Sequence, residues 1–186
     1  MAHIERRLNK HLYKIPEDAR IGSVLILLYE RDNEIKTVLI QRTEYKGVHS
    51  KQISLPGGKQ EHGESIQQAA LREAEEEVGV NSKDITLIGE LTQLYIPPSN
   101  FLVFPFIGCI DYAPSFLIQP DEVEELIEVS LDELNNPEII HEKSLRLSSG
   151  TVVMTPFFEI QERTVWGATA MMLSEFLQVI NELEFD

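Results

Sequence analysis

The sequence predicts one domain that mixes α-helices and β-strands, of the α/β or α+β class. Apolar runs of strand length alternate with segments of helical periodicity along the chain. With 186 residues, of which 42% are hydrophobic, the chain is long enough for a single domain with a core. We expect residues 21–186 to form that domain and residues 1–20 to form an N-terminal extension or a short helix.

The first half of the chain contains a short helix candidate and several strand candidates. Ile4, Leu8 and Leu12 recur at intervals of four residues, which favours a helix that ends before Pro16. Apolar runs predict strands at 22–30, 36–42 and 51–55, and a Pro-Gly-Gly turn at 56–58 is expected to end the third of them.

The second half follows the same alternation of strands and helices. Strands are predicted at 84–96, 101–110, 122–131, 143–149, 151–156 and 157–160. Residues 131–137 are predicted to form a short helix that closes at Pro137, and residues 166–183 an amphipathic C-terminal helix.

An acidic helix is predicted at residues 65–78, and Gly79 is placed to end it. At about 100° per residue, Glu73, Glu76 and Glu77 fall within one arc that lies beside the apolar arc of the helix. Like charges one turn apart destabilise a helix, and the helix dipole disfavours anions near its C-terminus. The carboxylates therefore carry two penalties at the rim of a buried face.

A divalent cation would remove both penalties. Mg²⁺ binds carboxylate oxygens and is commonly shared with substrate phosphates. The Gly57-Gly58 turn before the helix lets a backbone approach a ligand without obstruction by side chains. Glu73, Glu76 and Glu77 are thus candidate metal ligands, and Arg72 could orient them by bidentate pairing. The alternatives are a solvated acidic face and an ordinary surface ion pair of Arg72.

The composition argues against several classes of partner and location. A net charge of −15 is a poor match for the phosphate backbone of nucleic acids, and much of it can serve solubility. No apolar run approaches the roughly 18 residues that a membrane span needs. The first residues lack the apolar middle of a signal peptide, although their basic residues leave a transit peptide open. A single cysteine suits a reducing compartment, so we expect a cytoplasmic protein.

The glycine turn and the acidic helix together resemble the Nudix box. Gly58 is followed after five residues by Glu64, and after seven more by Arg72 and the run Glu73 to Val80. All fixed positions of that box are present, and Ala74 holds an aliphatic position. The resemblance implies hydrolysis of a nucleoside diphosphate linked to another group, with Mg²⁺ or Mn²⁺. It also implies an αβα sandwich with a mixed β-sheet, in which the box forms a loop–helix–loop.

Carried over by position, the resemblance assigns roles to the residues of the box. Glu73 and Glu77 would be the principal metal ligands, and Glu76 a further ligand or an organiser of the attacking water. Gly58 would offer its backbone carbonyl to a metal. Arg72 would hold the glutamates in place.

The segment before the box is similar to the signature of coenzyme A pyrophosphatases. An aliphatic strand, Arg42 and Thr43 lead into Pro-Gly-Gly at matching spacing, although Leu55 replaces a Phe. Arg42, Lys46, His49 and Lys51 are candidate substrate-binding residues, because coenzyme A carries a diphosphate and a 3′-phosphate. For the lysines, ordinary solvation of a loop is the alternative.

A second acidic run, Asp121 to Glu125, could bring a further carboxylate to the site from a loop. Glu124, and after it Glu122, is the candidate for completing a metal site or acting as a general base. Most of this run is otherwise expected to be solvated surface.

The reaction expected from these features is the attack of metal-activated water on a diphosphate of coenzyme A or its derivatives, giving 4′-phosphopantetheine and 3′,5′-ADP. One alternative is a Nudix hydrolase of ADP-ribose or a dinucleotide, and another is a nucleotide-binding domain without turnover. The expected partner is a small nucleotide, with no nucleic acid and no membrane. A homodimer stays open.

Overall fold

The computed structural model describes residues 15–43, 52–146, 150 and 152–183. The helix predicted around Ile4 to Leu12 lies outside the described residues, and so do the candidate ligands Lys46, His49 and Lys51. Whether residues 1–20 form a separate extension therefore stays a prediction.

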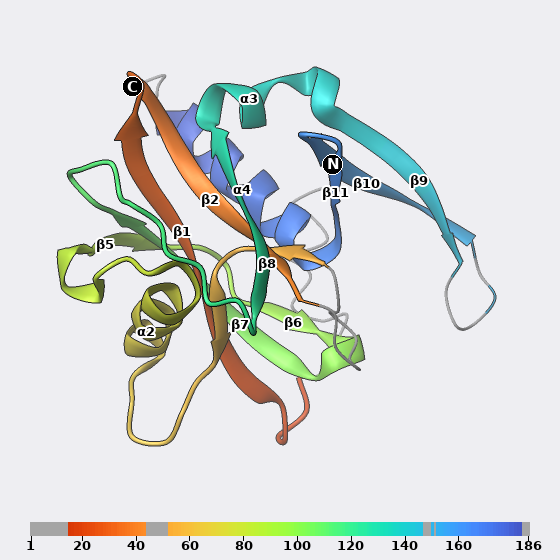
Figure 1. Cartoon of the computed structure of the whole chain (residues 1–186). Helices are drawn as coiled ribbons and strands as arrows, with labels where there is room; N and C mark the ends of the chain where they lie inside the picture. Colours follow the sequence, from red (N-terminus) through yellow and green to blue (C-terminus); the bar gives the residue numbers. More distant parts are fainter. Residues whose placement is uncertain (1–14, 44–51, 147–149, 151, 184–186) are drawn as a thin grey trace.

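A mixed β-sheet of eight strands forms the centre of the described fold (Figure 1). Its strands are β1 (Arg20–Arg31), β2 (Glu34–Arg42), β3 (Ile53–Ser54), β4 (Gly57–Lys59), β5 (Thr86–Glu90), β6 (Leu94–Ile96), β7 (Phe101–Cys109) and β8 (Val123–Ser130). The order along the main path is β3-β2-β1-β7-β5, while β4 pairs with β1, β6 with β7 and β8 with β2. Strands β1 and β7 pair in parallel, and the other strand pairs of this sheet are antiparallel.

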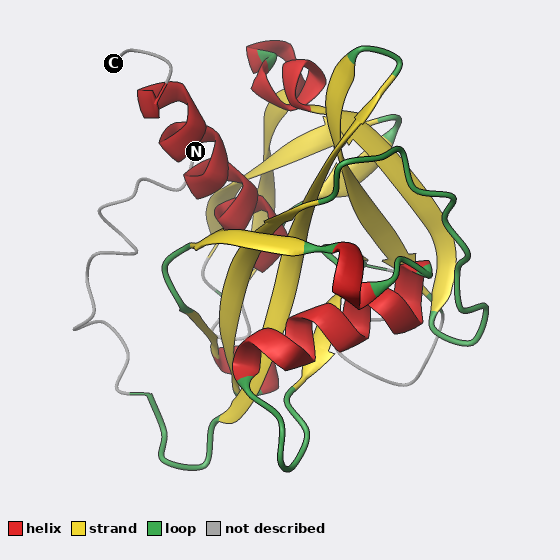
Figure 2. Ribbon diagram, turned by 90° about the vertical axis from the view of Figure 1, so that its left-hand side faces the viewer, coloured by secondary structure: helices red, strands yellow, loops and turns green. Residues whose placement is uncertain are grey.

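The sheet is covered by a helix on each face, α2 (Ile66–Val78) on one and α4 (Gly167–Leu183) on the other (Figure 2). Successive side chains of a strand point to opposite faces. Accordingly, Leu25 and Leu27 of β1 join the apolar cluster of α2, while Ile26 joins that of α4. A central strand buried on both faces must be apolar at nearly every position. This explains the unbroken apolar run in the sequence and confirms the predicted αβα sandwich with a mixed sheet.

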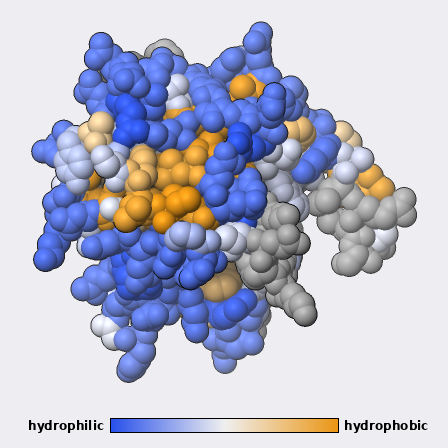
Figure 3. Space-filling model, in the orientation of Figure 1, coloured by the Kyte–Doolittle hydropathy of each residue, from blue (hydrophilic) through white to orange (hydrophobic). Residues whose placement is uncertain are grey.

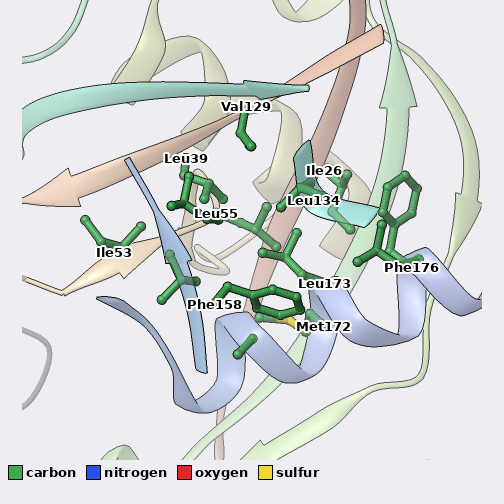
Figure 4. Packing of buried hydrophobic residues seen from close by; sticks show 14 of the residues in the cluster. Ile26, Leu39, Ile53, Leu55, Val129, Leu134, Phe158, Met172, Leu173 and Phe176 are labelled. Atoms are coloured by element: carbon green, nitrogen blue, oxygen red, sulfur yellow. The ribbon is translucent and has the colours of Figure 1, made fainter. Parts of the chain in front are cut away.

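The core on the α4 side also includes a smaller three-stranded sheet. Its strands are β9 (Ile140–Arg146), β10 (Val152–Ile160) and β11 (Arg163–Val165), in the order β11-β10-β9. Phe158 of β10 belongs to the same buried cluster as Leu173 and Phe176 of α4 and Ile26 of the main sheet (Figure 4). The short helix α3 (Leu131–Asn135) contributes the fully buried Leu134 to the same cluster. Three short 3₁₀ segments, η1 (Ser82–Asp84), η2 (Pro97–Ser99) and η3 (Pro137–Ile139), complete the described elements.

Several predicted strands differ from the observed ones at their boundaries. The run 84–96 is divided into β5 and β6, and the described residues 152–160 form one strand where two were predicted. Pro156 lies in the part of β10 that pairs with β9 alone, because β11 pairs only with residues from Phe158 onward, and a proline is tolerated where one side of a strand is unpaired. The Pro-Gly-Gly turn ends β3, as expected, but Gly57 then begins β4, which pairs with β1. Tertiary pairing decides these boundaries, because the local sequence permits either outcome.

Helix α2 begins and ends as its sequence predicts. Ser65 is the N-cap, and its side chain exchanges hydrogen bonds with Gln68 in a capping box. Gly79 ends the helix in the left-handed conformation, with φ of 74°. A Cβ atom at Gly79 would lie 2.7 Å from the carbonyl oxygen of Leu117, so the loop after β7 packs directly against the end of the helix.

The surface is mostly hydrophilic on the face shown in Figure 3, where apolar colour gathers in one central area. That polarity agrees with the net charge of −15. Among the described residues, no helix has both the length and the apolar character that crossing a membrane requires.

We expect Gly79→Ala to destabilise the protein clearly more than Gly63→Ala. Both glycines have positive φ, 74° and 92°, so an alanine at either site costs about 1–2 kcal/mol from backbone strain. A new Cβ at Gly63 would meet nothing within 4 Å, whereas at Gly79 it would collide with the backbone of Leu117. Urea unfolding of both variants measures the difference. Equal losses would contradict tight packing of the loop on the helix end.

Candidate functional site

Glu77 lies in the last turn of α2 and is fully buried. One of its carboxylate oxygens accepts a hydrogen bond of 2.7 Å from the backbone N–H of Gly57. The other accepts a hydrogen bond of 2.9 Å from Nη1 of Arg42, at the end of β2. A carboxylate at a helical position next to apolar residues is thus held by groups from two strands.

Burial raises the pKa of Glu77 from 4.5 to about 7. The guanidinium of Arg42 and the hydrogen bond from Gly57 oppose this rise, and the negative charges of Glu73 and Glu122 add to it. The contacts with Arg42 and Gly57 together therefore do not offset the cost of burying this charge. A cation placed among the three carboxylates would favour the ionised form.

Glu73 lies one turn before Glu77 and packs against the glycine turn. A Cβ atom added at Gly58 would lie 2.5 Å from the carboxylate of Glu73, so only glycine leaves room for this side chain. The side chain of Glu73 is 13% exposed, and burial raises its pKa. The Gly57-Gly58 turn thus contacts helix α2 through the side chains of Glu73 and Glu77.

Arg72 links the carboxylates that surround this point. Its guanidinium forms two hydrogen bonds of 3.0 and 2.9 Å with Glu64, and others of 2.9 Å with Glu73 and 2.8 Å with Glu76. It also donates to the carbonyl of Lys59, at 3.2 Å. These partners raise the pKa of Arg72, led by Glu64, and the same contact lowers the pKa of Glu64. Arg72 therefore ties α2 to the strand and the turn before it.

The loop between β7 and β8 closes over the C-terminal end of α2. The amides of Leu117 and Gln119 donate to the carbonyls of Val78 and Glu77, at 3.0 and 3.2 Å. These carbonyls belong to the last turn, where a helix has no partners of its own for its carbonyl groups. The loop takes the place of the next turn and is fixed relative to the acidic side chains.

The same loop ends at Glu122. The amide of Glu122 donates to the carbonyl of Gln119, and its own carbonyl accepts from the amide of Thr43, at 3.1 and 3.0 Å. The hydroxyl of Thr43 donates to the carbonyl of Asp121, at 2.9 Å. Two hydrogen bonds from Thr43, which directly follows β2, thus set the position from which the side chain of Glu122 extends.

Glu73, Glu77 and Glu122 form a group in which one carboxylate oxygen from each residue lies within 4.8 Å of the other two. Three carboxylates at this spacing repel one another strongly unless they are protonated or share a cation. Oxygen ligands alone suit hard ions such as Mg²⁺ and Mn²⁺. Burial, and after it the neighbouring negative charges, raises the pKa of Glu73 and Glu77, and a divalent cation would offset both effects, so the residues fit such an ion.

The other candidates from the sequence take different places. The side chain of Glu76 is 56% exposed and pairs with Arg72 instead of joining the group of three. Glu124 accepts a hydrogen bond of 2.9 Å from Gln41 on the exposed face, so Glu122 is the loop carboxylate that reaches the group. Arg42 lies beside Glu77 and Gly57.

Alternation along β8 does not distinguish Glu122 from Glu124 as the loop carboxylate of the site. Periodicity places Glu122 and Glu124 on one face, and nothing local shows that the strand begins only at Val123. The role of Glu64 as a partner of Arg72 was also missed. Glu64 directly precedes the N-cap Ser65, and Arg72 lies about two helical turns after it. This spacing is the signal in the sequence that could indicate the contact.

A cavity of about 460 Å³ lies on the other side of the glycine turn. Its wall includes Gly57, Gly58 and Lys59 of β4 and the first turns of α4. Arg42 reaches both the cavity and the acidic group. The two features therefore share the Gly57-Gly58 backbone as a common border.

The sequence is similar to those of two proteins from mouse and Caenorhabditis elegans. The mouse protein "Peroxisomal coenzyme A diphosphatase NUDT7" is 30% identical over 138 residues, a match that covers 73% of this chain and 57% of the mouse protein. "Nudix hydrolase 3" of Caenorhabditis elegans is 26% identical over 174 residues, covering 86% of this chain and 72% of the nematode protein.

Solved structures share the fold at lower identity. A MutT/nudix family protein of Enterococcus faecalis has a TM-score of 0.57 at 17% identity, covering 97% of this chain and 70% of its own. A MutT NUDIX hydrolase of Burkholderia pseudomallei has a TM-score of 0.51 at 20% identity, covering 84% of this chain and 96% of its own.

The family model described as the NUDIX domain matches residues 19–148. That range contains the glycine turn, helix α2, the loop after β7 and all three carboxylates of the acidic group. On this match, together with the geometry of the turn and the helix, the chain belongs to the Nudix family.

Proposed function

We propose that this Nudix protein hydrolyses coenzyme A or its derivatives with Mg²⁺ or Mn²⁺, giving 4′-phosphopantetheine and 3′,5′-ADP. The proposal of hydrolysis rests on one observation: Glu73, Glu77 and Glu122 each place a carboxylate oxygen within 4.8 Å of the others, beside the Gly57-Gly58 turn. Such a group is costly without a cation, and a cation held there is open to a diphosphate.

The choice of coenzyme A rests on two supports. The mouse relative is named as a coenzyme A diphosphatase, and it is 30% identical over most of this chain. The segment from the β2 strand to the Pro-Gly-Gly turn also resembles the signature of coenzyme A pyrophosphatases. In that segment, Lys46, His49 and Lys51 are proposed as cationic partners for substrate phosphates.

The proposed roles follow from the contacts of each side chain. Glu73, Glu77 and Glu122 would hold the metal, which when bound neutralises phosphoryl oxygens and lowers the pKa of a water. Arg72 orients Glu73 and Glu76 by hydrogen bonds. Glu76 is half exposed beside this group and is proposed to take the proton of the attacking water.

Arg42 is assigned a role that differs from direct phosphate binding. Its Nη1 already pairs with the buried Glu77, so it positions that carboxylate for the metal.

Conservative glutamine variants separate members of the acidic group from their neighbours. We expect Glu77→Gln and Glu122→Gln to lower kcat/KM for coenzyme A by about 100-fold or more, because each removes a carboxylate from the metal site. Glu124→Gln is the matched control in the same acidic run, since Glu124 faces Gln41, and it should stay within about threefold.

The measurement is product formation at saturating Mg²⁺, with circular dichroism to verify folding. Equal activity of the Glu122 and Glu124 variants would remove Glu122 from the proposed site. Unchanged turnover in Glu77→Gln would reject the metal site as a whole.

The raised pKa of Glu77 predicts an unusual pH dependence of stability for the metal-free protein. The folded state holds a proton on Glu77 up to about pH 7, whereas in the unfolded chain its pKa is 4.5. The folded state binds more protons between these values, so this group's contribution falls as the pH rises, by up to about 3 kcal/mol. Added Mg²⁺ should restore stability above pH 7, because it binds the ionised carboxylates.

Urea unfolding at pH 5 and pH 8, with chelator and with Mg²⁺, measures this effect. Glu77→Gln is the control, since its unfolding free energy should lack this part of the pH dependence. A variant that shows the same fall with pH as the natural sequence would contradict a raised pKa at Glu77.

A substrate panel tests the choice of coenzyme A. We expect kcat/KM for coenzyme A to exceed that for ADP-ribose and for diadenosine polyphosphates by tenfold or more, with Mg²⁺ or Mn²⁺. Identification of the products as 4′-phosphopantetheine and 3′,5′-ADP completes the test. Preference for ADP-ribose or a dinucleotide would assign the protein to that class, and absence of turnover with all of them would favour a binding domain.

A further inference from the structure

The cavity and the acidic group lie on opposite sides of β4. Ile53, Leu55, Val103 and Met172, which line the cavity, belong to the apolar core on the α4 side. Two members of the acidic group, Glu73 and Glu77, project from α2, which covers the other face of the sheet, and Glu122 joins them from the loop before β8. Gly58 borders both, because it lines the cavity and its missing Cβ leaves room for the carboxylate of Glu73. A substrate held at the metal can therefore extend past this glycine into the cavity.

The wall of the cavity is mainly apolar. Its apolar and aromatic side chains come from β1, β3, β6, the η2 segment, β7, the start of α4 and the residues next to β3 and α4; they are Val24, Ile53, Leu55, Ile96, Pro98, Phe101, Val103, Trp166, Ala168 and Met172. A volume of about 460 Å³ is within the range of small-molecule sites, which are commonly apolar with a few polar groups.

Charge is nearly absent from this wall. Among the described residues that line the cavity, Arg42 and Lys59 are the charged ones. Arg42 is paired with Glu77, and Lys59 is exposed at the border formed by β4. A phosphate group placed deep in the cavity would lose its water without gaining a cationic partner, which is costly. The interior suits an uncharged chain, and the rim suits a diphosphate.

We propose that this cavity binds the uncharged pantetheine arm of coenzyme A, while the diphosphate lies at the rim by Gly58 and Lys59. This inference rests on the proposed function and adds the orientation of the substrate. The pantetheine arm is a flexible chain of methyl, methylene and amide groups without formal charge. The nucleoside half carries a 3′-phosphate next to its ribose, so burial of the adenosine would bring that charge to an apolar wall. The nucleoside half therefore lies outside the cavity.

The fluorescence of Trp166 can report whether a ligand occupies the cavity. It is the single tryptophan of the chain and lines the cavity, so its fluorescence reports a ligand that enters. We expect pantetheine, which has neither phosphate nor nucleoside, to change this emission in a saturable way. The nucleoside product 3′,5′-ADP should not do so at concentrations that inhibit the enzyme.

A filling variant tests whether the signal comes from the cavity. Ala168→Leu adds bulk to the wall at the start of α4, and we expect it to weaken the binding of pantetheine by about tenfold or more. Gln178→Leu is the matched control, because it places a leucine at an exposed position of the same helix. It should leave pantetheine binding within about twofold. Thermal unfolding verifies that both variants are folded.

Product inhibition provides a second reading. In Ala168→Leu, inhibition by 4′-phosphopantetheine should weaken about tenfold, while inhibition by 3′,5′-ADP should stay within about twofold. Weakened inhibition by 3′,5′-ADP alone, or by both products equally, would overturn the proposed orientation. So would a pantetheine signal that Ala168→Leu leaves unchanged.

The two proposals fail separately in these experiments. If coenzyme A is not hydrolysed at all, the proposed function is wrong, whatever Trp166 reports. If coenzyme A is hydrolysed but pantetheine leaves the emission of Trp166 unchanged, the orientation is wrong and the proposed function stands.

Discussion

The buried carboxylate of Glu77 is the constraint on which the rest of the site depends. It lies where α2, the end of β2 and the start of β4 meet, and Arg42 and the amide of Gly57 each donate one hydrogen bond to it. Without these two donors, a charge at this depth would be strongly disfavoured. Their presence fixes the distance between the helix and the turn, and burial still raises the pKa to about 7. The two donors thus hold a carboxylate whose ionised form is disfavoured, and a bound cation would stabilise that form.

The glycine turn separates two environments of opposite character. On the side of α2, the missing side chain of Gly58 admits Glu73, and the backbone of Gly57 contacts Glu77. On the side of α4, the same residues border a cavity with an apolar wall. A molecule that is charged in the middle and uncharged at one end matches this arrangement. The matching depends on glycine, because any side chain at position 58 would occupy the place of the Glu73 carboxylate.

Much of the helix and sheet could be predicted from local sequence. The capping box at Ser65, the left-handed Gly79 and the apolar run of β1 each have a direct physical cause within a few residues. The boundaries of β4, β5 and β10 could not be predicted in this way. Gly57 joins a strand because β1 offers a partner, and the sequence around it is that of a turn.

The sequence by itself determined that Glu73, Glu76 and Glu77 share one side of a helix behind a Pro-Gly-Gly turn, because helical periodicity and glycine conformation are local properties. The tertiary structure decided which of them are buried, since packing against β2 and β4 encloses Glu77 and leaves Glu76 half exposed. It also chose Glu122 over Glu124, because the loop that caps α2 sets where β8 begins. Contacts between residues far apart in the chain have no periodic signal, and the approach of Glu122 to Glu73 and Glu77 is such a contact.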